Sequence, residues 1–281
     1  MKKYLILIFL FAGIVMTVIS CKKDQSYRAK FKTTSGDALV KIMNVAPNFL
    51  AATGYSDNFN VWIANLKVNG PLLPYATTLA GGYPSTVATF PIATANNNTY
   101  AAVRTGDQHI RLSLQGKTLI DSLTIIDVPF YLGPNTKYSI FITDSFKLTP
   151  SKYIFQDNFL TPDSGKYAVR FAHMVVNDTA GKKVDVYSVK QATILFSNVA
   201  PGTVTDFMSL PLKSGDTISI LRAGTSFELT RYPPSNPSPI TSGPSAITYS
   251  NSKRVYTIIY KGDGKLTTGA KQRSVIVLNN Q

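Results

Sequence analysis

Apolar and polar residues alternate in short segments along almost the whole chain. The segments "KYSIFIT" (137–143) and "KVDVYSV" (183–189) are typical, since successive side chains of a strand point to opposite faces of a sheet. Clusters of Gly, Pro and Asn separate these segments, and beyond residue 26 no apolar stripe with helical spacing continues over three turns. The pattern therefore predicts an all-β protein.

The segments that predict strands form two successive sets. The first set is Val40–Asn44, Asn60–Val68, Thr86–Phe90, Ile110–Leu114, Leu119–Val128 and Tyr138–Thr143. The second set is Tyr167–His173, Val184–Ser188, Thr203–Leu210, Thr217–Arg222, Val255–Tyr260 and Ser274–Leu278.

The two sets match each other, which predicts an internal repeat. The matching pairs are "GDALVKIMNVAPN" (36–48) with "GKYAVRFAHMVVN" (165–177), "FNVWIANLKVNG" (59–70) with "KVDVYSVKQAT" (183–193), "NTKYSIFITDS" (135–145) with "SKRVYTIIYKGDG" (252–264), and "KYIFQDN" (152–158) with "SVIVLNN" (274–280). A repeat of this length suits an immunoglobulin-like sandwich of about 100 residues. We therefore expect two tandem immunoglobulin-like β-sandwich domains, over 36–160 and 163–281.

The second repeat also carries a recognisable series of motifs. Val169-Arg170-Phe171 with His173, the "VDVY" strand over 184–187, Gly202 with Phe207, and the corner Leu210-Pro211 follow one another in order. This series resembles the domain-of-unknown-function family 4397. The first repeat departs from it, because Asn44 stands where His173 does. The resemblance implies secreted or surface β-sandwich modules with no established biochemical activity.

The N-terminus has the order of a secretory signal peptide. Lys2-Lys3 precede an apolar run over 4–19, and Ser20-Cys21 follows. A transmembrane anchor needs about 20 apolar residues, which is longer than this run. The segment 18–21, "VISC", resembles the lipobox of bacterial lipoproteins, in which the cysteine thiol carries a diacylglycerol. We therefore expect a signal peptide over 1–20 and lipid attachment at Cys21, the only cysteine in the chain.

The residues after Cys21 predict a polar tether over 21–35. "KKDQ" (22–25) partly resembles the signal that directs Bacteroidota lipoproteins to the outer face of the outer membrane. The sequence thus predicts a protein anchored to the outer membrane by lipid and exposed at the cell surface.

Residues able to carry out catalysis are few. The two histidines lie in non-equivalent places: His109 follows Gly106-Asp107-Gln108 at a predicted turn, with Asp107 as its candidate partner, and His173 shares a strand face with Val169 and Phe171. We interpret His173 as a hydrogen-bonded structural residue, and one Asp with one His is a weak signal for a triad. The acidic residues are scattered singly, whereas a glycosidase needs two carboxylates about 5–10 Å apart. The sequence therefore predicts no enzyme and no catalytic residues.

No cofactor or metal site is predicted either. "KGDGKLTTG" (261–269) is rich in Gly and Asp but lacks the alternating ligands and the distant Glu of an EF-hand loop. We interpret this segment as a hairpin turn built on Asp263-Gly264.

The chain is basic, with 29 Lys and Arg against 15 Asp and Glu. Removal of Lys2 and Lys3 with the signal peptide leaves 27 basic residues and a net charge of +12. These residues are dispersed and no nucleic-acid-binding signature accompanies them. We therefore expect no nucleic acid as a partner, and at most an attraction to acidic glycans or lipid phosphates.

Two loops are candidate binding sites, since function often lies on loops that a sandwich supports. They are "GGYPST" (81–86) with Tyr83 and "RYPPSNPSPITSGP" (231–244) with Tyr232. A tyrosine offers an apolar face and a hydrogen-bonding tip, which suits sugar rings. Trp62, inside a strand, is interpreted as a core residue. The first hypothesis is a lipid-anchored binding module, facing the surface or the periplasm, that binds a glycan or another extracellular ligand beside uptake machinery. The alternative is a structural or adhesive envelope component that contacts another protein.

Overall fold

The computed structural model describes residues 36–49, 59–64, 66–68, 89–90, 100–113, 124–178, 183–213, 216–232, 253–269 and 271–280. Cys21, the predicted tether and Tyr83 lie outside these residues. The elements of the described part are strands β1 to β18 and one 3-10 turn, η3. No helix among the described residues has the length and apolar character needed to cross a membrane.

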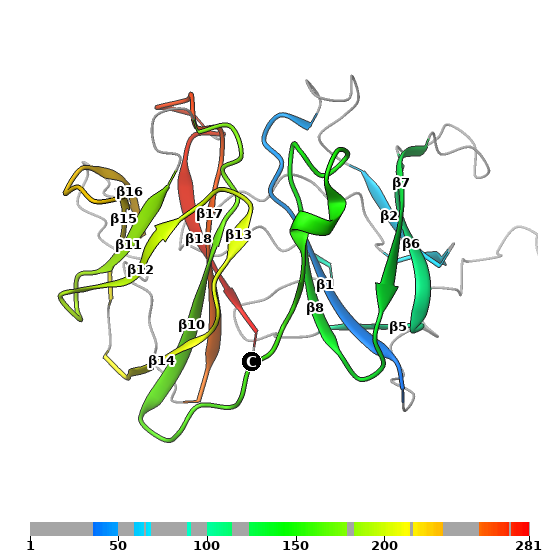
Figure 1. Cartoon of the computed structure of the whole chain (residues 1–281), viewed down its shortest axis with the longest axis horizontal. Helices are drawn as coiled ribbons and strands as arrows, with labels where there is room; N and C mark the ends of the chain where they lie inside the picture. Colours follow the sequence, from blue (N-terminus) through cyan, green and yellow to red (C-terminus); the bar gives the residue numbers. More distant parts are fainter. Residues whose placement is uncertain are drawn as a thin grey trace, which may run out of the picture.

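The first unit is a sandwich of two sheets (Figure 1). One sheet has the order β4-β1-β8-β9, with β5 also paired to β1, and the other has the order β3-β2-β6-β7. The bounds are β1 (Ala38–Asn44), β2 (Asn60–Ile63), β3 (Leu66–Lys67), β4 (Thr89–Phe90), β5 (Ala101–Val103), β6 (Gly106–Ser113), β7 (Thr124–Leu132), β8 (Lys137–Ile142), η3 (Pro150–Tyr153) and β9 (Ile154–Gln156).

The second unit repeats this arrangement strand by strand. Its sheets have the orders β13-β10-β17-β18, with β14 also paired to β10, and β12-β11-β15-β16. The bounds are β10 (Lys166–His173), β11 (Val184–Ser188), β12 (Thr193–Val199), β13 (Thr203–Val204), β14 (Met208–Pro211), β15 (Ile218–Arg222), β16 (Glu228–Tyr232), β17 (Val255–Lys261) and β18 (Ser274–Asn279).

The parallel pair β1–β8 of the first unit corresponds to the parallel pair β10–β17 of the second, and their registers identify equivalent residues. Asn44 lies opposite Ile142 where β1 runs parallel to β8, and His173 lies opposite Tyr260 where β10 runs parallel to β17. The predicted fold class, tandem β-sandwiches of immunoglobulin-like architecture, is confirmed.

Some predicted strands differ from those in the structure. The segment 60–68 is a hairpin rather than one strand, because the chain turns at Ala64, whose φ is 51°. The segment 203–210 is divided between β13 and β14. Neither β12 nor β16 was predicted. The register between β11 and β12 shifts, and Asn198 of β12 has a φ of 55°, which together indicate a β-bulge. This bulge interrupts the alternation of apolar and polar residues along β12, which is the pattern that predicts a strand.

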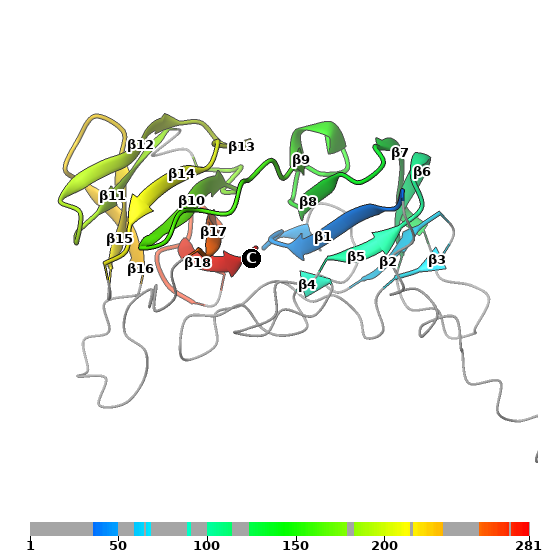
Figure 2. The same ribbon diagram turned by 90° about the horizontal axis from the view of Figure 1, so that it is seen from below.

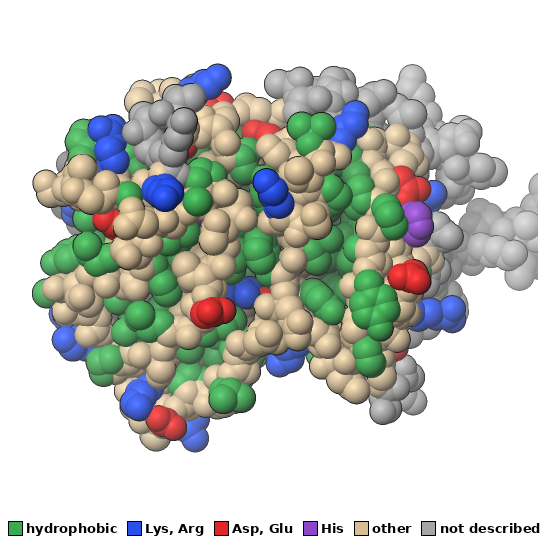
Figure 3. All heavy atoms as spheres, in the orientation of Figure 1, with side chains coloured by type: hydrophobic (Ala, Val, Ile, Leu, Met, Phe, Trp, Pro, Cys, Tyr) green, Lys and Arg blue, Asp and Glu red, His purple; other side chains and the backbone are tan. Residues whose placement is uncertain are grey.

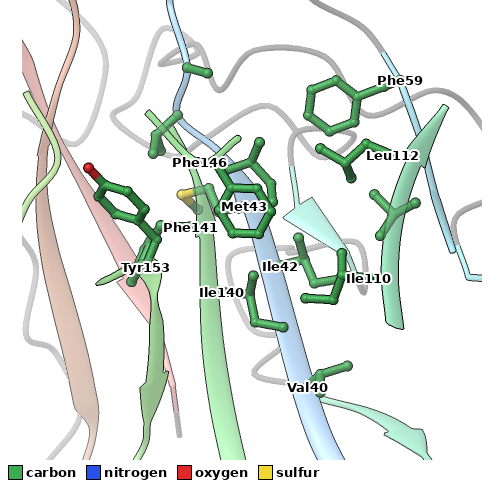
Figure 4. Packing of buried hydrophobic residues seen from close by; sticks show 14 of the residues in the cluster. Val40, Ile42, Met43, Phe59, Ile110, Leu112, Ile140, Phe141, Phe146 and Tyr153 are labelled. Carbon is green, nitrogen blue, oxygen red and sulfur yellow. The ribbon is translucent and has the colours of Figure 1, made fainter. Parts of the chain in front are cut away.

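The core of the first unit lies between its two sheets (Figure 4). Val40 and Ile42 of β1 point toward Ile110 and Leu112 of β6, and all four side chains are fully buried. Side chains at alternate positions of β1 and β8, such as Phe141, point to the other side of that sheet, toward the second unit (Figure 4).

The same apolar cluster continues into the second unit. Ala172 and Met174 near the end of β10, Ile259 of β17, and Ile276 and Leu278 of β18 belong to it. A separate cluster fills the second sandwich between its own sheets. The sheets that contain β1 and β10 therefore pack against each other. Figure 2 shows the two units side by side, with β9 leading into β10. The domain boundary near residue 162 stays a prediction.

Candidate functional site

A buried polar network joins the two units at their interface. Arg170 of β10 is 2% exposed, and its Nη2 atom lies 2.5 Å from Oδ1 of Asp157, which follows β9. The same Nη2 donates to the Ser139 hydroxyl at 3.0 Å, and the Arg170 Nε donates to the Thr257 hydroxyl at 3.0 Å. Arg170 thus contacts β8 and the end of β9 in one unit and β17 in the other.

The Asp157 carboxylate is the acceptor of this network. Its Oδ2 accepts from the Ser139 hydroxyl at 2.7 Å and from the Tyr100 hydroxyl at 2.8 Å. Lys41 lies 4.4 Å over the Tyr100 ring and donates to the backbone carbonyl of Asn279 at 2.9 Å. Burial lowers the pKa of Lys41 to about 7, although Asp157 opposes this shift. These contacts join the two units through the buried side chains of Lys41, Asp157 and Arg170, with Tyr100 partly buried beside them.

A second contact between the units lies at the loop that joins β17 to β18. This loop was predicted as a hairpin turn, and it does connect two paired strands. The Asp263 carboxylate also accepts from Asn48 of the first unit at 2.5 Å and from Asn177 at 2.8 Å. The Gly264 amide donates to the Asn177 side chain at 2.9 Å. No cluster of three or more His, Cys, Asp or Glu suited to a metal ion occurs in the described part of the chain.

His109 has a different partner from the predicted one. Asp107 lies two residues away on β6, whereas the His109 Nδ1 contacts Oδ1 of Asp127 on β7 at 2.8 Å. Both side chains of this pair are more than half exposed, at 60% and 51%. The predicted pairing with Asp107 is therefore wrong. Pro129 of β7 lies opposite His109, so Asp127, two residues away on the same face of β7, lies diagonally across from His109.

His173 lies in the core, and its ring does not make the hydrogen bond that was predicted for it. Its ring is fully buried, and neither ring nitrogen has a hydrogen-bond partner among the described residues. It packs edge-on against Tyr260, with the ring centroids 5.1 Å apart, and against Phe171. Burial lowers the pKa of His173 to about 4, so the ring is neutral at pH 7.

Aromatic and charged side chains, some exposed and some partly buried, lie together on the outer face of the β3-β2-β6-β7 sheet. We call this surface the β6–β7 face, and it consists of Trp62, His109, Arg111, Asp127 and Tyr131. Their strand neighbours point inward: Val61, Ile63, Ile110, Leu112, Ile126, Val128 and Leu132 are buried. Strand alternation therefore turns all five side chains away from the core.

Trp62 is a surface residue and not part of the core. It is only partly buried, its Nε1 donates to the Ser113 hydroxyl at 2.8 Å, and the Arg111 guanidinium lies 5.0 Å over its ring. The prediction of a core tryptophan is wrong, because Val61 and Ile63 already occupy the inward positions of β2. The same alternation was the signal in the sequence that could have placed Trp62 on the outer face.

Tyr131 is the most exposed tyrosine among the described residues, at 63%. It lies on β7 opposite Asp107 of β6, and Asp127 lies opposite Arg111 on the same strands. The face therefore combines aromatic rings with both hydrogen-bond donors and acceptors. Basic side chains elsewhere on the visible surface form separate groups rather than one patch (Figure 3).

The two predicted ligand-contact residues are not part of this face. Tyr83 lies outside the described residues. Tyr232 is the last residue of β16, paired with Ile218, and its side chain and the proline-rich loop after it lie outside the described residues.

An open edge strand would favour the alternative hypothesis of a protein partner that adds a strand. β7 pairs with β6 alone within the described part of the chain. It carries Pro129 near its middle, and a proline has no N–H to donate to an added strand. This edge is therefore poorly suited to strand addition.

No family model and no curated protein matches the chain. Among solved structures, a streptococcal virulence factor described as binding α-glucan is 12% identical, with a TM-score of 0.24 over 85% of this chain and 96% of that chain. The Bacillus anthracis TIE protein is 10% identical, with a TM-score of 0.20 over 87% and 44%. The fimbrial anchor protein Mfa2 from Porphyromonas gingivalis is 11% identical, with a TM-score of 0.21 over 87% and 97%. Likeness at this level carries no argument about function.

Proposed function

We propose that the chain is a lipid-anchored protein of the cell envelope that binds an extracellular ligand and catalyses no reaction. The observation that carries this proposal is the β6–β7 face, where exposed aromatic and polar side chains stand on a sheet of a firmly packed sandwich. The lipobox-like segment ending at Cys21 supports the anchor, and the resemblance to family 4397 fits a surface module. Both stay predictions.

The geometry around His109 supports a binding role rather than catalysis. A nucleophile and its base lie within about 3 Å of each other in a catalytic pair. The hydroxyl on the same side of β6 belongs to Ser113, four residues and about 14 Å along the strand. That hydroxyl already accepts the indole N–H of Trp62. The hydrogen-bond partner of the His109 ring within the described part of the chain is thus a carboxylate and not a hydroxyl.

Replacement of Cys21 by serine tests the anchor. Metabolic labelling with an acyl analogue is expected to label the wild-type protein and leave Cys21→Ser unlabelled, because the thiol is the attachment atom. Ser20→Ala is the matched control and should keep the label, since it keeps both a small residue and the thiol. Equal labelling of Cys21→Ser would remove the lipoprotein assignment.

A further inference from the structure

We infer that the β6–β7 face binds a neutral saccharide chain, with Tyr131 as the stacking platform and Arg111, His109 and Asp127 as hydrogen-bonding groups. This inference rests on the proposed binding function and names its site and the chemical class of its ligand.

The register of the strands arranges the face in parallel rows. Lys67, Trp62, Arg111 and Asp127 form one row across β3, β2, β6 and β7. His109 and Pro129 form the next row, and Asp107 and Tyr131 form the third. Successive rows are two residues apart along a strand, or about 7 Å. The rows that contain Arg111 and Tyr131 therefore lie about 14 Å apart along the strand backbone. That length favours an extended chain over a single small molecule.

The chemical groups on the face match those of a sugar. An exposed tyrosine ring offers an apolar surface to the C–H face of a sugar ring, and its hydroxyl bonds to water or ligand. The carboxylate of Asp127 accepts from hydroxyl groups, and the guanidinium of Arg111 donates to them. Arg111 is held over the Trp62 ring, and Asp127 is held by His109 at 2.8 Å. These contacts orient both groups before a ligand arrives, which lowers the entropic cost of binding.

The balance of charge selects a neutral ligand. Asp127 on the face and Asp107 opposite Tyr131 supply two carboxylates, and the guanidinium of Arg111 and the ammonium of Lys67, which lies opposite Trp62 on β3, balance them. An acidic saccharide approaching Arg111 meets the Asp127 carboxylate in the same row. The dispersed positive charge of the chain therefore does not mark this surface as an anion site, which departs from the attraction to acidic glycans predicted from composition.

The test is binding of the full-length protein to immobilised oligosaccharides of glucose, mannose and xylose, with an oligosaccharide of galacturonic acid as the acidic comparison. We expect at least one neutral chain to bind, and binding to persist in 1 M NaCl, where the Debye length is about 3 Å. Tyr131→Ala is expected to weaken this binding about tenfold or more through loss of stacking. Asp127→Asn is expected to weaken it several-fold.

Phe227→Ala is the matched control. Phe227 is a 56% exposed ring on the second unit with the Arg222 guanidinium 4.7 Å away, so it imitates the aromatic and cationic contacts of the β6–β7 face. Its removal should leave binding unchanged, and the circular dichroism spectra of all variants should match that of the wild type.

The possible results test the binding site, the class of ligand and the binding function separately. Neutral saccharide binding that Tyr131→Ala and Asp127→Asn leave intact would overturn the site, while a binding function would stand. Binding of the acidic chain alone, abolished by salt, would overturn the ligand class. Absence of any saccharide binding by a protein whose Cys21 carries lipid would overturn the saccharide assignment and favour an envelope protein as the partner.

Discussion

Replacing Arg170 with methionine is expected to lower the free energy of unfolding by about 3–5 kcal/mol, because it leaves the buried Asp157 carboxylate without the guanidinium that contacts it directly. The Asp157 side chain is fully buried and cannot regain water without opening the interface. Methionine fills a similar volume, so the loss reports charge and hydrogen bonding rather than an empty cavity. Urea denaturation of the full-length protein, followed by circular dichroism, measures the change.

Two further variants make this result interpretable. Lys166→Ala removes an exposed ion pair with Asp163 and is expected to cost less than about 1 kcal/mol. Combining Arg170→Met with Asp157→Leu removes both charges and should recover part of the lost stability. If Arg170→Met is no more destabilising than Lys166→Ala, the network does not hold the two units together.

Acidification from pH 6.5 to pH 4 is expected to destabilise the protein through His173, by an amount on the order of 3 kcal/mol. The pKa of His173 is lowered from 6.5 to about 4 by burial, so the folded protein resists protonation of this ring across that range. The unfolded chain, with an ordinary histidine pKa, binds the proton readily. Lower pH therefore favours the unfolded state. Above pH 6.5 the His173 ring is neutral in both states and costs no stability, and the loss of stability grows as the pH falls from 6.5 toward 4.

The measurement is the slope of unfolding free energy against pH for the wild type and for His173→Phe. Phenylalanine keeps an aromatic ring beside Tyr260 but carries no titrating group. The wild type should show the steeper loss between pH 6.5 and pH 4, whatever the absolute stability of the variant. Equal slopes would mean that the His173 ring accepts its proton in the folded state at an ordinary pH.

The alternation of side chains was enough to predict most of the central strands and the repeat. Val40 and Ile42 of β1, and Val169 and Phe171 of β10, alternate so regularly that they predict both the strands and their inward faces. The edge strand β12 was missed because the bulge near Asn198 breaks this period. Local pattern thus reveals a strand only where the pairing is regular.

The alternation of side chains could not predict the interface between the two units. Arg170 stands between two core residues and reads as an ordinary outward-facing polar residue of a strand. Its burial depends on how the β1 and β10 sheets pack, which brings Asp157 and Ser139 to it from another sandwich. The partner of His109 was missed for a related reason, because the register of β6 with β7 selects Asp127 over the nearer Asp107.

The β6–β7 face contains a built-in reporter, since Trp62 is the only tryptophan in the chain. Titration of the full-length protein with the neutral oligosaccharide that binds best should change the Trp62 fluorescence and reach saturation. The same change should persist in 1 M NaCl, and Tyr131→Ala should shift its midpoint to higher ligand concentration. A saccharide that binds by calorimetry while the emission of Trp62 stays constant up to saturation would place the ligand elsewhere and contradict the account.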